Sequence, residues 1–238
     1  MPKAKMKVVQ CWDDGVLTDI RLTELLRKYN AKATFNLNPG GMNSDHRTES
    51  KWITDGTWSY NGFRCGKLSQ KDIAEIYDGF ELASHCWKHE NADSMPVDQW
   101  IKTAVDARNF LEDIVQKPCT GFAWPCGVHT PETRQALREH GFTYGRTVDD
   151  VTFVTDCDDV MAMPVNVHFL RWQFFERYEK AKECGVFYFW GHSYELMNYE
   201  ELWQHFEERL KFINDDPDSE WANINDIIPL CKNSADIL

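Results

Sequence analysis

Short apolar segments alternate with segments of helical periodicity along most of the chain. The apolar segments are rich in β-branched and aromatic residues, whereas the helical segments repeat apolar residues every three or four positions. This alternation is typical of a parallel α/β fold, because each parallel strand is reached through a crossover that is usually a helix. We predict about seven strands, at residues 7–12, 32–37, 80–84, 121–124, 144–148, 161–169 and 186–190.

Helix start and stop signals lie between these strands. Ser69 is a candidate N-cap for a short helix over 69–77, and Thr130 followed by Pro131 begins a helix that Gly141 ends. We expect further helices near 22–29, 100–114, 173–184 and 202–210, with 221–228 forming either another strand or an irregular closing segment.

Residues 39–68 interrupt this alternation. They are polar, contain Gly, Asn, Ser and Trp, and show no sustained period. Because 238 residues suit one sizeable domain, we interpret the chain as a single domain over 1–238 with an insertion at about 39–68. Long loops in compact domains are often functional.

Composition excludes several classes of partner. The net charge of −12 argues against nucleic acid and against an anionic membrane surface, since both are bound by basic surfaces. No apolar run reaches transmembrane length, and no apolar run follows the basic N-terminus as in a signal peptide. The eight cysteines include no C-x-x-C pair. We therefore expect a cytoplasmic protein with mostly reduced cysteines, and the oligomeric state stays open.

Two polar motifs directly follow predicted strands. Asp13 and Asp14 follow the first, and His85 and His89 follow the third. Two imidazoles and one carboxylate can hold a zinc-type ion with positions left for water and substrate, and the spare aspartate can act as a base. Each motif also has a structural explanation: Asp-Asp-Gly favours turns, and two histidines can fall four apart by chance.

Three further residues fall at strand ends, namely Pro125, Arg146 and His192. In barrels of parallel strands the active site forms at the carboxyl ends of the strands. Each residue alone is compatible with a turn or with a backbone-bonded side chain. Their joint occurrence with the two motifs at one edge favours a metal-dependent hydrolase.

Together these motifs resemble those of the polysaccharide deacetylase family, the NodB-homology domain of carbohydrate esterase family four, over residues 8–228. The resemblance implies a distorted (β/α)7 barrel. The family motif Thr-Phe-Asp-Asp-Gly matches here with Asp13 as the general base and Asp14 as a metal ligand. The family motif His-Ser/Thr-x-x-His matches with His85 and His89 as the other two metal ligands.

The remaining family motifs match less fully. His192 matches the histidine acid, whereas the fourth motif, Asp-x-x-Asp-Trp, is not recognisable. Cys86 replaces the hydroxyl residue of the histidine motif. In the third motif Ala123 stands where the family has arginine, and Cys126 replaces an aromatic residue whose backbone N–H is the oxyanion donor. Because Arg146 lies one strand away from Ala123, we predict that it supplies the missing cation and forms a salt bridge with Asp13.

Aromatic residues adjoin these motifs. Trp12, Trp124 and Trp190 are candidates for substrate contacts together with Cys126, although each tryptophan can equally belong to the core. Trp87 lies close to the histidine motif and has the same two interpretations. His168 follows the sixth strand and either lines the cleft or is structural.

The resemblance implies a hydrolase that removes N-acetyl groups from a sugar or oligosaccharide with one divalent ion. Two imidazoles and a carboxylate suit Zn, and also Co, Ni or Fe. Three alternatives remain: an amidohydrolase acting on a small non-sugar amide or ureide, an O-acetyl esterase, and a catalytically inactive carbohydrate-binding module.

Overall fold

The computed structural model describes residues 4–232 of the chain. Strand β1 (Met6–Asp13) lies inside the main sheet, and nearly all of its residues are buried. It pairs in parallel with β10 (Val186–Gly191) on one side and with β2 (Thr34–Leu37) on the other. A strand that is covered on both faces needs a nearly continuous apolar run, and the sequence of β1 provides one.

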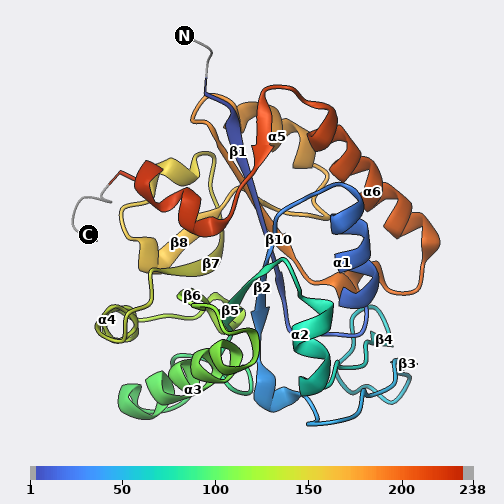
Figure 1. Cartoon of the computed structure of the whole chain (residues 1–238), viewed down its shortest axis with the longest axis vertical. Helices are drawn as coiled ribbons and strands as arrows, with labels where there is room; N and C mark the ends of the chain where they lie inside the picture. The colour runs from blue at the N-terminus through green and yellow to red at the C-terminus, as the bar shows by residue number, and fades with distance from the viewer. Residues whose placement is uncertain (1–3, 233–238) are drawn as a thin grey trace.

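The main sheet has the strand order β8–β7–β6–β5–β2–β1–β10–β9, and all of its pairings are parallel (Figure 1). A short strand near the C-terminus, β11 (Ser219–Trp221), also pairs with the start of β1. The other strands of the sheet are β5 (Glu81–Ser84), β6 (Gly121–Ala123), β7 (Tyr144–Asp150), β8 (Met163–Val165) and β9 (Val167–His168).

Residues 163–168 bring the two ends of this sheet together. The segment predicted as one strand pairs first with β7, as β8, and then with β10, as β9. Between them the buried Asn166 accepts a hydrogen bond from Tyr188 N (2.7 Å) and donates one to Thr152 O (2.9 Å). Its side chain satisfies backbone groups where the chain changes partner. With β8 and β9 sharing one position, seven positions form a nearly closed ring, so the predicted (β/α)7 barrel is confirmed.

Helices cover the outside of this ring (Figure 1). Both predicted caps are confirmed: Ser69 forms a capping box with Asp72, and Thr130 accepts a hydrogen bond from Thr133 N ahead of Pro131. Among residues 4–232, no helix is long and apolar enough to cross a membrane. The helices are α1 (Asp19–Lys28), α2 (Ile73–Ile76), α3 (Val97–Val115), α4 (Pro131–Glu139), α5 (Phe174–Ala181) and α6 (Glu200–Asp215).

Alternate residues of β1 face two different parts of the core, as the pleat of a strand requires. Val8 and Trp12 belong to the cluster that contains apolar side chains of α1 and α6. Val9 and Cys11 belong to the cluster that contains side chains of β6, β7 and β10. Asp13 has the parity of Val9 and Cys11, so β1 delivers it to the inner side of the barrel at the carboxyl end.

The expected insertion contains a two-stranded antiparallel sheet of its own, β3 (Lys51–Trp52) with β4 (Phe63–Arg64). Isolated bridges join its ends to the barrel loops, at Val16 with Lys67 and at Asn43 with Ser69. At the other end of the chain, β11 is followed by short 3₁₀ turns, so residues 221–228 are mostly irregular.

Candidate active site

A cavity of about 510 Å³ opens at the carboxyl ends of the central strands. Since the carboxyl ends of parallel strands share one edge, polar residues from distant parts of the sequence meet there. The cavity is lined by all of the predicted catalytic and metal-binding residues and by three predicted substrate contacts: Asp13, Asp14, His85, His89, Trp124, Cys126, Arg146, Trp190 and His192.

Two side chains hold Asp13 by hydrogen bonds, and a third lies close to it. Arg146 Nη2 donates to both of its carboxylate oxygens, at 2.6 and 2.5 Å, and Asn36 Nδ2 donates to one of them at 2.7 Å. His192 Nε2 lies 3.9 Å away. Arg146 is the register partner of Ala123, so the arginine is displaced by one strand from the family position. The predicted Arg146–Asp13 ion pair is confirmed.

The electrostatic surroundings keep Asp13 ionised. Burial acts to raise the pKa of Asp13, but the Arg146 guanidinium, supported by His85 and His192, outweighs burial and lowers it. The pKa of Arg146 is raised, because the attraction of Asp13 outweighs burial. A carboxylate that is ionised and hydrogen-bonded in a fixed direction can accept a proton from a group in the cavity.

Asp14, His85 and His89 form a group whose possible ligand atoms all lie within 4.8 Å of one another. His85 Nδ1 bonds to Ala123 O at 2.8 Å, and its Nε2 has no hydrogen-bond partner among the described residues. Burial lowers the pKa of His85 to about 4, which leaves the ring neutral and able to act as a ligand. A backbone carbonyl on the other ring nitrogen is the usual way to orient a metal-binding histidine.

Asp14 is an ionised member of the same group. Burial acts to raise its pKa, but the charges of Lys67 and of the nearby histidines outweigh burial and lower it. Asn38 Nδ2 donates to Asp14 Oδ1 at 2.8 Å, which fixes the carboxylate. Two imidazoles with an ionised carboxylate are a donor set that fits a zinc-type ion.

The backbone around this group is strained. Asp14, Cys86, His89 and Cys126 all have positive φ angles, of 87°, 59°, 67° and 54°. Such angles are uncommon outside glycine, and they persist where the surrounding structure enforces them, often at functional sites. The strained residues are therefore the ones that direct side chains, and in Cys126 a backbone N–H, toward the cavity.

Cys126 occupies the short 3₁₀ turn Pro125–Gly127, and its side chain is exposed. Its backbone N–H donates no hydrogen bond within residues 4–232, whereas the next N–H, that of Gly127, bonds to Trp124 O at 2.9 Å. The free N–H is suited to bind a carbonyl oxygen in the cavity.

His192 follows β10 and is held by Glu195, which lies one turn further on. Glu195 Oε2 accepts hydrogen bonds from His192 N at 2.9 Å and from His168 Nε2 at 2.8 Å. His192 Nδ1 lies 3.4 Å from the same oxygen, at ion-pair distance but without good hydrogen-bond alignment. Burial acts to lower the pKa of His192, but Glu195 and Asp13 outweigh burial and raise it. His192 is thereby suited to carry a proton.

Two predicted substrate contacts line the cavity, but they differ in exposure. Trp190 is half-buried, and Arg146 lies over its ring at 5.0 Å. Trp124 is fully buried, stacks on Trp100 at 5.2 Å and donates to Met161 O at 2.8 Å. Trp124 therefore supports the wall of the cavity and presents little surface to a ligand.

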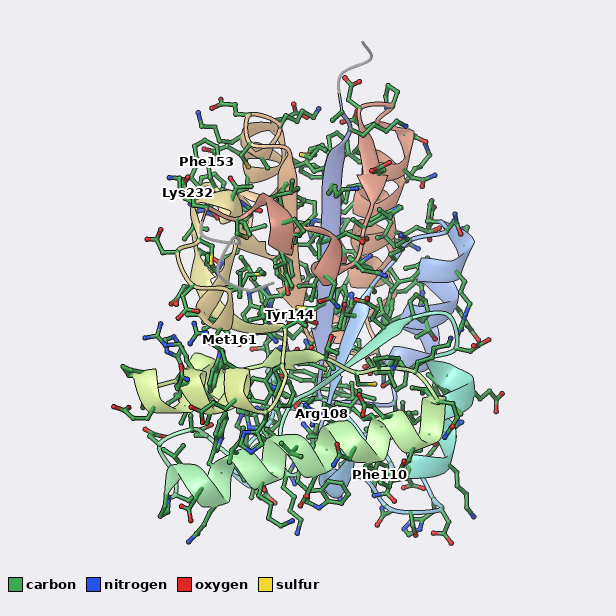
Figure 2. The ribbon with its side chains drawn as sticks, turned by 60° about the vertical axis from the view of Figure 1, so that its left-hand side comes forward. Arg108, Phe110, Tyr144, Phe153, Met161 and Lys232 are labelled. Carbon is green, nitrogen blue, oxygen red and sulfur yellow. The ribbon has the colours of Figure 1, made fainter. Side chains whose placement is uncertain are left out.

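The prediction that Trp12 contacts the substrate is wrong. Trp12 is fully buried on the outer face of β1, where its ring lies 5.1 Å from that of Phe206 on α6. Neighbouring residues of a strand point to opposite faces, so Trp12 and Asp13 cannot both face the cavity. Trp87 does not line the cavity either. Its ring packs on Phe110 at 5.4 Å, a residue of α3 labelled in Figure 2, and anchors the histidine loop to that helix.

Four residues that contact the catalytic or ligand side chains were not predicted from the sequence. Asn36 lies in β2, and Asn38 lies just after it. Polar residues in a buried segment were a usable signal for both of them. Glu195 stands three residues after His192, and that spacing was its only local signal. Lys67 carries no local signal: it reaches the site from the insertion and donates to Asp14 O at 2.6 Å.

Comparison with known proteins identifies the family and the fold. A family model described as polysaccharide deacetylase matches residues 1–145. No curated protein sequence matches this chain significantly.

Solved structures share the fold at low sequence identity. A polysaccharide deacetylase described as putative, from Mycobacterium smegmatis, superimposes with a TM-score of 0.65 and 16% identity over 95% of this chain and 90% of that chain. Peptidoglycan deacetylase PdaC from Bacillus subtilis gives 0.57 and 14%, over 95% and 91%. A family 4 acetyl xylan esterase from Clostridium thermocellum, in complex with a cobalt ion, gives 0.54 and 17%, over 94% and 91%.

Proposed function

Because this chain belongs to the polysaccharide deacetylase family, we propose that it is a metal-dependent hydrolase that removes N-acetyl groups from a sugar or oligosaccharide. One observation carries the proposal: a single cavity holds an ionised, oriented carboxylate, Asp13, beside the three-residue ligand group of Asp14, His85 and His89. Both features place titratable groups with shifted pKa values around one cavity, which is typical of functional sites.

Asp14, His85 and His89 are the residues that would hold the divalent ion. Two imidazoles and a carboxylate favour Zn, and Co, Ni and Fe also accept this donor set. When bound, the ion supplies Lewis-acid chemistry: it polarises the acyl carbonyl and makes a water molecule more acidic. The cobalt ion in the related acetyl xylan esterase is consistent with such a site.

Asp13 acts as the general base. It takes a proton from the water that attacks the carbonyl carbon, and Arg146 and Asn36 keep its oxygens in place during this transfer. The Cys126 N–H donates to the carbonyl oxygen as that oxygen becomes negative. One such donor contributes about 3–4 kcal/mol to the stabilisation of the transition state.

His192 acts as the general acid. When the C–N bond breaks, the nitrogen of the sugar needs a proton, and His192, whose Nε2 lies 3.9 Å from Asp13, delivers it. Glu195 and Asp13 raise its pKa, which favours the protonated form that this step uses. An amide nitrogen depends on protonation to leave more strongly than an ester oxygen does. A positioned general acid therefore favours N-acetyl over O-acetyl substrates.

The test is an acetate-release assay with the metal-loaded protein. We expect acetate and new amino groups from N-acetylchitotetraose, and loss of both after dialysis against a chelator. Acetylated xylan is compared in the same assay, and allantoin, which carries no acetyl group, is followed by its own hydrolysis. Turnover of allantoin alone would replace the proposal with ureide hydrolysis, and turnover of acetylated xylan alone would replace it with O-acetyl esterase activity.

A further inference from the structure

We propose that the hairpin of the insertion, through Trp58, forms a sugar-stacking subsite beside the catalytic cavity, so that the substrate is an oligosaccharide rather than a single sugar. The inference rests on the proposed function and adds the length of the substrate. The hairpin consists of β3, β4 and the loop between them, and Figure 1 shows it at the edge of the molecule.

Trp58 combines high exposure with a place in the active site. Its residue surface is 66% exposed, yet it lines the same cavity as Asp13 and Asp14. Single exposed tryptophans are common and need no explanation. Trp172, at 81% exposed, is one of these, because it does not line the cavity. The position of Trp58 is therefore what calls for a function.

The backbone of Trp58 is fixed in spite of this exposure. Arg64 Nε and Nη2 both donate to Trp58 O, at 3.0 and 2.8 Å, and Arg64 Nη2 also donates to Thr57 Oγ1 at 2.6 Å. Asp55 in turn accepts hydrogen bonds from Thr57 N and Thr57 Oγ1. An ordered backbone lowers the entropy that a ring loses when it stacks on a ligand.

A chain of aromatic contacts joins this ring to the catalytic acid. Trp58 meets Tyr194 edge to face at 5.8 Å, and Tyr194 stacks on His192 with ring centres 4.7 Å apart. The ring of Trp58 is thus placed at the mouth of the cavity, at a fixed relation to the group that protonates the leaving amine.

The cavity also continues beyond the catalytic residues. A second cavity of about 450 Å³ shares Trp190 and Val148 with the first. Tyr60, from the same hairpin, lines this second cavity, and its ring lies 5.8 Å from that of Tyr194. Trp58 and Tyr60 of the hairpin, with Trp190 of the barrel, therefore give aromatic walls to a continuous groove.

The chemistry of these walls fits neighbouring sugar rings. Trp58, Tyr60 and Trp190 are uncharged, broad and partly polar, and such rings present an apolar face with one hydrogen-bonding edge. Pyranose rings likewise have an apolar C–H face and a polar rim. A small amide or ureide would fit entirely beside the catalytic residues. It would leave the ring of Trp58 without a contact.

The test compares chain-length dependence in the wild type and in hairpin variants. KM and kcat are measured with N-acetylglucosamine and with its β-1,4-linked dimer to pentamer, by acetate release. Trp58→Ala should raise KM for the tetramer about tenfold, equivalent to ~1.4 kcal/mol of binding, with little change in kcat. Trp58→Phe should restore most of the affinity.

Trp52→Ala is the matched control. Trp52 belongs to the same hairpin and is 51% exposed, but it packs on Tyr199 and Phe63 and does not line the cavity. We expect its KM for the tetramer to stay within twofold of the wild type. An equal rise in KM for Trp52→Ala and Trp58→Ala would overturn the subsite, because it would indicate a general loss of hairpin structure.

Failure of the subsite is distinguishable from failure of the proposed function. If the wild type turns over the monomer and tetramer with the same kcat/KM, the subsite is wrong and deacetylation stands. If the wild type releases no acetate from any of these sugars, the proposed function is wrong. Calorimetric titration with the fully deacetylated tetramer then decides the subsite: binding that Trp58→Ala weakens supports it, and no binding removes it.

Discussion

Two groups of potential metal ligands lie near each other at the carboxyl end of the barrel, and they differ in what their atoms already bond. Asp14, His85 and His89 form the first group, and His168, His192 and Glu195 form the second. In each group the possible ligand atoms lie within 4.8 Å of one another, so proximity alone does not distinguish them.

In the first group, Asp14 and His85 are fixed by residues outside the group. His85 bonds to Ala123 O and Asp14 accepts from Asn38, and among the described residues no hydrogen bond joins Asp14, His85 and His89 to one another. Their remaining ligand atoms are free to converge on an ion. Support from a surrounding shell with free inner atoms is the pattern of a metal site.

In the second group the members bond to one another. Glu195 Oε2 accepts from His168 and from the backbone of His192, and these histidines outweigh burial to lower the pKa of Glu195 to about 2. An ion there would have to displace these bonds. The comparison teaches that a carboxylate with two histidines can serve either as a metal site or as a proton-carrying group, and that internal hydrogen bonds decide which.

The largest expected effect comes from removing a ligand of the first group. Asp14→Asn should weaken metal binding by more than about 100-fold and abolish nearly all turnover, since even supporting residues of metal sites cost 10–100-fold. Glu195→Gln should keep the metal. Metal content after dialysis, measured by plasma mass spectrometry, checks both variants, and loss of metal from Glu195→Gln alone would reverse the assignment of the two groups.

The second effect concerns Asp13, which lies between the groups. Asp13→Asn should lower kcat by ~10²–10⁴, the usual contribution of a general base, and leave the metal content unchanged. The same assays apply. Should Asp13→Asn lose the metal while Asp14→Asn keeps it, the roles of the two aspartates would be exchanged.

Arg146→Met tests the partner of the base. Its loss leaves a buried charge on Asp13 without compensation, so unfolding in urea should show a decrease of about 3–5 kcal/mol in stability. Activity requires ionised Asp13 and falls as pH drops through its pKa. Without Arg146, burial raises that pKa, and the acid limb of the pH–rate profile should move to higher pH.

Arg146→Lys is the control for this variant, because it keeps a positive charge but lacks the planar guanidinium. It should shift the acid limb less than Arg146→Met does. An unchanged acid limb in Arg146→Met would show that Asp13 is not the base.

The smallest effect is expected for Glu195→Gln. Activity requires protonated His192 and is lost as pH rises through its pKa, which Glu195 helps to raise. The alkaline limb of the pH–rate profile should therefore move to lower pH, and kcat at neutral pH should fall by less than about 10²-fold. A shift of the acid limb instead would place Glu195 with the base.

The sequence allowed the barrel and most of the site to be predicted, for physical reasons. The alternation of strand and helix patterns fixes parallel strands, and parallel strands collect their carboxyl ends at one edge. Arg146 could be placed beside Asp13 because Ala123 and Arg146 lie on neighbouring strands, β6 and β7. The same reasoning could have excluded Trp12, since it alternates with Asp13 along β1.

Other features depend on tertiary contacts that local patterns do not carry. The split of 161–169 into β8 and β9 follows from a change of pairing partner at Asn166. Lys67 and Trp58 reach the site because bridges such as Val16 with Lys67 dock the insertion on the barrel. No periodicity within 39–68 indicates that docking.

The central claim is that the first group, and not the second, holds the ion. Crystals soaked in Zn or Co, with anomalous scattering collected at the metal edge, test it most directly. We predict one strong peak within bonding distance of Asp14, His85 and His89. A peak among His168, His192 and Glu195, with the first group pointing apart, would contradict the account.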